Sequence, residues 1–316
     1  MKRPRWSAVA PILAVLLVAV VALAQPPGRA ARVGLIVTTP ALKDAFLEGM
    51  RDSGYVEGQG LILIHRPLGD EAVAEILRQN VDVICATSQP MVRAAKQATT
   101  TVPVIGVDLE SDPVANGLVK SLARPGGNVT GTFLDLPELG GKLIQLLRKS
   151  VPGLTQIAIV WHSDVGKTQF IATEQAARSV RLGLVSLPVR SVEDLRRAFE
   201  TARLKRAGGM VVLSAPLMLH ERALIADLGS KHHLPTIGLF AAFPDAGGLL
   251  SYGPSFPEIM RGAAGQVARV LRGAHPAELP VQRPTKFELV ANLKTARALG
   301  MTLPPSVLLQ ADRVIE

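Results

Sequence analysis

Polar and aromatic side chains follow the short apolar runs of this chain, where they could together bind a small molecule. In the first half these residues are Thr38, Thr39, Thr87, Ser88, Gln89 and Asp108. In the second half they are His162, Ser163, Asp164, Ser214, Phe240 and Tyr252. Hydroxyl groups at the start of a helix, together with the free amides of its first turn, receive anionic groups such as carboxylates. The aspartates could hold an ammonium group, and the aromatic rings could flank the body of a ligand.

Each of these residues also has a purely structural interpretation. Thr38, Thr87 and Ser88 could be helix caps, and an aspartate could belong to a surface turn. A lone histidine such as His162 is more often structural than a metal ligand. The repetition of polar residues after the apolar runs of both halves favours binding. We therefore predict all twelve residues to be ligand-binding residues.

No catalytic motif accompanies them. Gly166-Lys167-Thr168 resembles the end of a phosphate-binding loop, but Trp161 stands where its first glycine is required. Gly58-Gln59-Gly60 lacks the third glycine of a dinucleotide fingerprint, and no nucleophile stands beside a base. The single cysteine, Cys85, excludes a disulfide within the chain and a paired-cysteine metal site. The sequence predicts a binding protein that is not an enzyme, with no cofactor and no metal.

Strands alternating with helices position these residues. Apolar runs typical of buried strands alternate with amphipathic stretches, and the order occurs twice along the chain. This pattern predicts parallel sheets covered by helices on both faces, in which ligands bind beyond the carboxyl ends of the strands. The expected strands span 32–37, 61–65, 81–86 and 102–107, and then 156–161, 184–188, 209–213 and 234–239.

The organisation of the chain fits two lobes. Its 316 residues are 48% hydrophobic, which suits two domains of ordinary size. Extra elements follow the second repeat: a strand at 247–252, a helix at 256–271, a Pro-rich stretch at 276–284 and a helix at 289–299. We expect an α/β protein with two doubly wound parallel-sheet lobes joined by a multi-crossing hinge. The first lobe would comprise 30–131 plus about 248–280, and the second 132–247 plus about 281–316.

The N-terminus has the features of a secretory signal peptide. A basic start, an apolar run over residues 8–24 and the small-residue end Ala22-Leu23-Ala24 predict cleavage after residue 24. An uncleaved membrane anchor is the alternative. The net charge of +9 comes from scattered Lys and Arg without a recognition motif, so no nucleic-acid partner is expected.

Several segments, in order, match a known family. The most specific are the Leu-Ala-Arg-Pro-Gly-Gly-Asn block at 122–128 and the Pro-Thr-Lys-Phe-Glu-Leu block at 284–289. Over roughly residues 31–316 the chain resembles the ABC-transporter substrate-binding proteins of the tryptophan/tyrosine type. The resemblance implies a type I periplasmic binding fold with a ligand in the interlobe cleft, and with it an ABC permease as partner. The signal peptide predicts a periplasmic location, and we expect a monomer. The ligand would be an amino acid or a related carboxylate. The alternative is a ligand-sensing partner of a membrane receptor that transports nothing.

Overall fold

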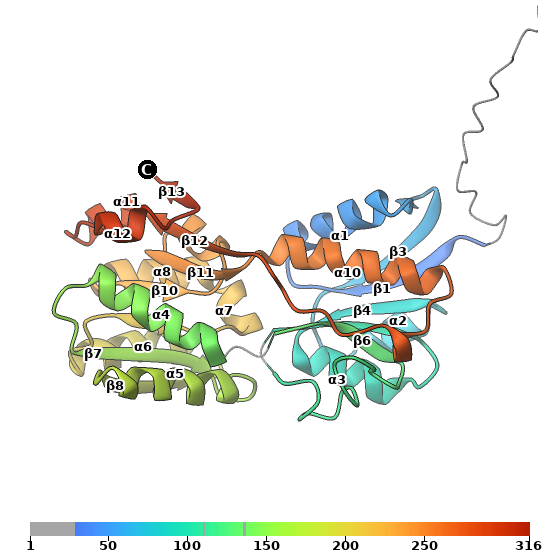
Figure 1. Ribbon diagram of the computed structural model, residues 1–316, viewed down its shortest axis with the longest axis horizontal. Coiled ribbons are helices and arrows are strands. Elements are labelled where there is room, and N and C mark those ends of the chain that lie inside the picture. The colour runs from blue at the N-terminus through green and yellow to red at the C-terminus, as the bar shows by residue number, and fades with distance from the viewer. Residues whose placement is uncertain (1–28, 110, 135–136) are drawn as a thin grey trace, which may run out of the picture.

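The computed structural model describes residues 29–109, 111–134 and 137–316, without the side chains of residues 137 and 138 (Figure 1). The predicted signal peptide, 1–24, lies outside the described residues. Two α/β lobes lie side by side along the long axis of the molecule, and segments of the chain run between them (Figure 1).

The first lobe is built on a six-stranded sheet, in which all neighbouring strands are parallel. β4 and β5 are buried along their whole length, because helices cover both faces of the sheet. The order β2-β3-β1-β4-β5-β6 consists of Val56–Glu57, Gly60–Arg66, Ala31–Ile36, Val83–Thr87, Val104–Asp108 and Val129–Phe133. The helices are α1 (Pro40–Asp52), α2 (Ala72–Leu77), α3 (Gln89–Ala98) and α10 (Phe256–Leu271).

The second lobe has a seven-stranded sheet. The order β13-β12-β11-β10-β9-β7-β8 consists of Arg313–Ile315, Phe287–Asn292, Leu250–Pro254, Thr236–Gly238, Met210–Val212, Gln156–His162 and Gly183–Val189. Its helices are α4 (Pro137–Ser150), α5 (Lys167–Ser179), α6 (Val192–Leu204), α7 (Pro216–His220), α8 (Arg222–Lys231), α9 (Ala242–Asp245), α11 (Leu293–Ala298) and α12 (Pro305–Leu308). The predicted fold of two α/β lobes is confirmed, although β12 pairs antiparallel with β11.

The prediction of one helix over 289–299 is wrong. Its first part is β12, and the helix α11 begins only after Asn292. The Asn292 side chain accepts a hydrogen bond from the backbone N–H of Thr295, 3.0 Å away, and thereby caps the start of α11. The apolar residues before Asn292 instead pair with β11.

The chain crosses between the lobes at three places. It leaves the first lobe after β6, returns between β11 and α10, and leaves again between Gln282 and Phe287 (Figure 1). The predicted boundary near 248 is wrong, because β11 hydrogen-bonds to β10 and β12 in the second sheet. The return crossing therefore lies at about Ser255. β6 likewise extends the first lobe to Phe133, beyond the predicted 131.

α10 completes the first lobe, although most of the second lobe lies between it and the rest of the first lobe in the sequence. It packs along α1, and at Gly49 a Cβ atom would lie 2.7 Å from the backbone of Arg261 (Figure 1). The Arg261 guanidinium also contacts the Glu48 carboxylate at 2.6 Å. The two helices thus approach too closely for a side chain at position 49.

Candidate ligand-binding site

A pocket lies between the lobes, at the carboxyl ends of β1, β4 and β5. Its volume is about 20 Å³, which is room for about one water molecule. In this arrangement of the lobes the pocket therefore does not enclose a ligand of the size of an amino acid. We call this the interlobe pocket; it is lined by Thr38, Leu68, Thr87, Ser88, Val107, Leu109, Ser214, Ala215, Pro216, Leu219, Phe240 and Phe256.

Ser88 is the most unusual residue of the interlobe pocket. Its backbone has φ +75° and ψ 148°, a conformation that non-glycine residues rarely adopt. Two hydrogen bonds fix this turn between β4 and α3: the Ser88 N–H donates to the Val107 carbonyl at 2.8 Å, and the Ser88 carbonyl accepts from Val92. Only 7% of Ser88 is exposed, and its hydroxyl oxygen has no hydrogen-bond partner. A strained residue with a buried, unpaired hydroxyl is typical of a functional site.

The neighbouring hydroxyl groups have different surroundings. The Thr87 hydroxyl donates to the Ile36 carbonyl at 2.9 Å and so ties the ends of β4 and β1 together. Thr38 is half-buried and lines the pocket, whereas Thr39 precedes α1 and does not line it. The side chains of Thr39 and Ser88, which directly precede α1 and α3, make no capping hydrogen bond, and that of Thr87 bonds to Ile36 instead.

The second lobe contributes Ser214 and Phe240. The buried side chain of Gln169 makes two hydrogen bonds to the backbone of Ser214. Gln169 Oε1 accepts from the Ser214 N–H at 3.2 Å, and Gln169 Nε2 donates to the Ser214 carbonyl oxygen at 3.4 Å. Phe240 stacks on Phe256 of α10 with ring centroids 4.9 Å apart. This stack joins the two lobes. Sequence analysis missed Gln169 and Phe256, because nothing in the sequence shows that they meet these loops.

Asp108 and Tyr252 lie close to the crossings but do not line the interlobe pocket. Asp108 is fully buried and its carboxylate accepts a hydrogen bond from the Ser111 hydroxyl, so it does not line the interlobe pocket. Tyr252 stacks on Phe287 with centroids 6.1 Å apart, and Lys142 Nζ lies 5.4 Å from the Tyr252 ring. Contacts of Asp108 and Tyr252 with a ligand stay predictions.

A wider pocket opens beside the first, again between the lobes. Its volume is about 440 Å³, and Gln89 and Asp164 are the predicted residues that line it. We call it the outer basin. It is lined by Gln89, Pro90, Arg93, Ala94, Gln97, Ser111 and Asn116 from the first lobe, and by Asp164, Val165, Lys167 and Thr168 from the second.

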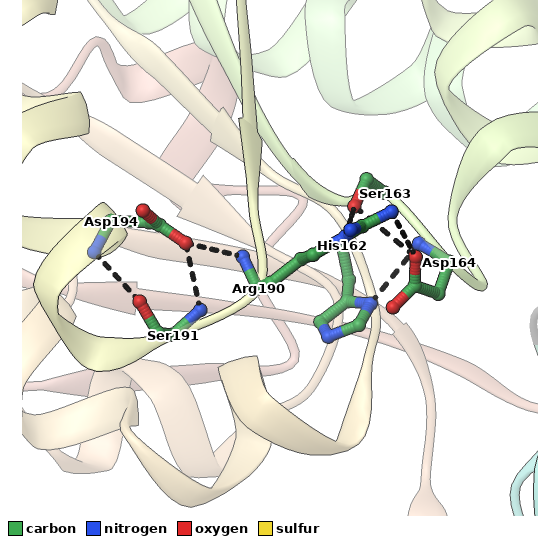
Figure 2. A network of polar contacts seen from close by, with 6 residues as sticks. All are labelled: His162, Ser163, Asp164, Arg190, Ser191 and Asp194. Carbon is green, nitrogen blue, oxygen red and sulfur yellow. Dashed lines mark hydrogen bonds and ion pairs between the residues drawn. The ribbon is translucent and has the colours of Figure 1, made fainter.

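Arg190 holds the loop that contains the predicted residues His162, Ser163 and Asp164 (Figure 2). Its Nε donates to the Ser163 hydroxyl at 2.7 Å, and its Nη2 lies 2.8 Å from Asp164 Oδ1. The Asp164 N–H donates to His162 Nδ1 at 3.3 Å. Of the three residues, only Asp164 reaches the outer basin; His162 and Ser163 line neither pocket.

Asp194, in the first turn of α6, is bonded to the backbone of Arg190 and so supports this network (Figure 2). Its carboxylate accepts from the backbone N–H of Arg190 at 2.9 Å and from that of Ser191 at 3.1 Å, and it pairs with Arg197. These contacts, the Arg190 N–H first, lower the Asp194 pKa from 3.8 to about 2. A lowered pKa in the folded state stabilises the fold above pH 4.

We expect this contribution to disappear in acid. Asp194→Asn should lower the melting temperature at pH 7, and the gap to the unchanged protein should close as the pH falls from about 4 to about 2. Circular-dichroism melts of both proteins across this range would measure the gap. A gap of constant size would show that the carboxylate charge does not contribute.

Two further properties concern the described residues only. Within 29–109, 111–134 and 137–316, no group of three or more His, Cys, Asp or Glu side chains is placed to hold a metal ion. Within the same residues, no helix combines the length and the apolar character needed to span a membrane.

Two α/β lobes, three crossings and a pocket between the lobes define a type I periplasmic binding fold. Residues 32–315 match the model of the family described as ABC transporter substrate binding protein, and the chain belongs to this family. The resemblance noted in the sequence is thereby confirmed.

Three known proteins show the relationship. A protein of Clostridioides difficile named tyrosine-binding protein is 25% identical over 84% of this chain and 79% of its own length. A conserved domain protein from Vibrio cholerae is 24% identical, with a TM-score of 0.83 over 90% of this chain and 100% of its own. A Streptococcus pneumoniae ABC domain, solved in complex with L-Trp, is 24% identical, with a TM-score of 0.80 over 90% of this chain and 99% of its own.

Proposed function

We propose that this protein captures a small solute, an amino acid or a related carboxylate, in the interlobe pocket and delivers it to an ABC permease. It would do so on the periplasmic side of the inner membrane, after export by the predicted signal peptide. The observation that carries the ligand class is Ser88, whose buried hydroxyl has no partner and whose backbone is strained at the start of α3.

The composition of the pocket supports an amphipathic ligand. The Ser88 hydroxyl and the first turn of α3 would receive an anionic oxygen. Most of the other lining side chains are apolar, among them Leu109, Leu219 and the stacked pair Phe240 and Phe256. Apolar walls with a few oriented polar groups are typical of small-molecule sites. The names of the two amino-acid-binding relatives agree with such a ligand.

The narrow pocket supports capture by closure. A space of about 20 Å³ cannot hold an amino acid, so the ligand must enter an open form and be enclosed by rotation about the three crossings. Phe256 moves with the first lobe and Phe240 with the second, so the stacked pair would close on the ligand. The closed arrangement of the two lobes would then be what a permease recognises.

A thermal-shift screen of residues 25–316 tests the proposal. The panel holds the twenty amino acids, aromatic acids, small carboxylates, nucleosides and sugars, and each hit is repeated with its carboxamide, which lacks the negative charge. A ligand that binds only the folded protein stabilises it by about 2.7 kcal/mol at a hundredfold excess over its Kd. We expect a shift with a carboxylate and little or none with its amide. Shifts only with nucleosides or sugars, or no shift at all, would overturn the proposed ligand class.

A further inference from the structure

The outer basin continues the site beyond Ser88. Gln89 lines the basin and directly follows Ser88, which lines the interlobe pocket. Along α3, Gln89, Arg93 and Gln97 are spaced four residues apart and present one helix face to the basin. The start of α5 lies opposite, in the other lobe. One ligand could therefore extend from Ser88 into the basin.

Each lobe contributes a cation to the outer basin. Arg93 is exposed and its guanidinium contacts amide oxygens: Asn116 Oδ1 at 3.5 Å and, with the Gln89 amide turned to accept, Gln89 Oε1 at 2.6 Å. Lys167, at the start of α5, is the cation of the second lobe. Among the described residues, neither cation has a carboxylate within ion-pair distance.

The carboxylate that lines the basin already has a cation as its partner. Asp164 is the only Asp or Glu among the described lining residues, and Arg190 pairs with it at 2.8 Å and also with Ser163 (Figure 2). Arg190 does not itself line the basin. Among the described lining residues, Arg93 and Lys167 are therefore the charged groups without a countercharge, and both are positive.

We propose that the outer basin binds a second anionic group of the ligand, which bridges Arg93 and Lys167 when the lobes close. This deepens the proposed function and rests on it: the ligand class narrows to a short molecule with an anionic group at each end. Closure brings the two cations toward each other in a space that loses water. Their mutual repulsion opposes closure, and an anion between them reverses this effect. The second anionic group would thus make closure depend on the ligand.

Isothermal titration calorimetry with matched probe pairs tests this inference. The pairs are L-glutamate with L-glutamine, and 4-carboxy-L-phenylalanine with L-phenylalanine, which differ in charge at the far end. A hydrogen bond to a charged group contributes about 1.5–3 kcal/mol, so the acidic probe of at least one pair should bind about tenfold or more tightly than its neutral partner. In Arg93→Gln/Lys167→Gln this preference should vanish. Lys205→Gln should keep it, because Lys205 is an exposed cation after α6 that lines neither pocket.

A second set of variants tests the effect of the Asp164 carboxylate on binding of the acidic probe. Arg190→Gln leaves the Asp164 carboxylate unpaired at the basin and should weaken binding of the acidic probe more than that of the neutral probe. Adding Asp164→Asn to Arg190→Gln removes this charge and should restore the preference. If Arg190 has a purely structural role, Arg190→Gln should lower the affinity for both probes equally, and adding Asp164→Asn should not restore the preference for the acidic probe.

The outcomes separate this inference from the proposed function. If the neutral probes bind as tightly as the acidic ones, the inference is overturned while capture of a carboxylate stands. The same holds if neither pair binds but other carboxylates of the thermal-shift panel do. If no carboxylate binds at all, the proposed function and this inference fail together. A preference that survives Arg93→Gln/Lys167→Gln would also overturn the inference.

Discussion

Replacing Ser88 with glycine should make the protein more stable and its ligand binding weaker. The backbone at φ +75° and ψ 148° costs a non-glycine residue about 1–3 kcal/mol. Glycine removes this strain but loses more chain entropy on folding, about 0.5–1 kcal/mol. The buried hydroxyl without a partner also disappears. We expect a net gain of about 1 kcal/mol, seen as a rise of about 2 °C in Tm.

Ser88→Ala is the matched control, because alanine lacks the hydroxyl but keeps the strain. Both variants should bind a carboxylate ligand about tenfold or more weakly, since each lacks a hydrogen bond to a charged group. Only the glycine variant should gain the stability that relief of strain provides. Calorimetric titration and thermal melts of the apo proteins measure the two effects separately. Unchanged affinity in both variants would show that the Ser88 hydroxyl does not bind the ligand. A lower Tm for Ser88→Gly would show that the Ser88 backbone conformation does not destabilise the protein.

Gly131→Ala should destabilise the protein strongly. Gly131 lies in β6 with φ +145°, directly opposite Gly106 of β5. A Cβ atom at position 131 would lie 1.9 Å from the Gly106 carbonyl oxygen. Because that oxygen belongs to the backbone of a buried strand, relief requires β5 and β6 to separate. We expect a loss of about 3 kcal/mol or more, or about 6 °C or more in Tm.

Gly127→Ala provides the control within the same segment of chain. A Cβ atom there would meet no heavy atom within 4 Å, and its φ lies outside the region that favours glycine. This substitution should change the stability by less than about 0.5 kcal/mol. Chemical denaturation of the two variants, with the unchanged protein as reference, measures both effects. Equal denaturation midpoints for the two variants would show that the close contact between the backbones of β5 and β6 at Gly131 does not affect the stability.

The sequence predicted the fold well where the hydrophobic pattern is strong. The alternation of buried strands and amphipathic helices predicted both lobes, because central parallel strands such as β4, β5 and β9 are covered on both faces. It failed near the crossings, where an element can belong to either lobe. The run around Leu250–Pro254 looks like any buried strand, and only its pairing with β10 and β12 places it in the second sheet. β12 is antiparallel and follows a crossing, so no repeat in the sequence indicates it.

The sequence predicted those pocket residues whose place in the fold follows from the end of a strand. The rule that ligands bind beyond strand ends predicted Thr38, Thr87, Ser88, Ser214 and Phe240, which do line the interlobe pocket. Their contacts with a ligand stay predictions. The rule does not predict which way a side chain turns, and the Asp108 carboxylate turns to the Ser111 hydroxyl. It also does not identify contributions from another part of the chain, such as Phe256 in α10.

The late position of α10 and β12 in the chain has a consequence for folding. The first sheet ends at residue 133, but α1 lacks its packing partner until residues 256–271 are available. The second sheet likewise lacks two of its strands, β12 and β13, until residues 287–292 and 313–315 are available. Neither lobe can complete its core from an uninterrupted stretch of chain. The two lobes therefore depend on contacts between residues distant in sequence, which slow folding, and a nascent chain gains its native stability only near its end.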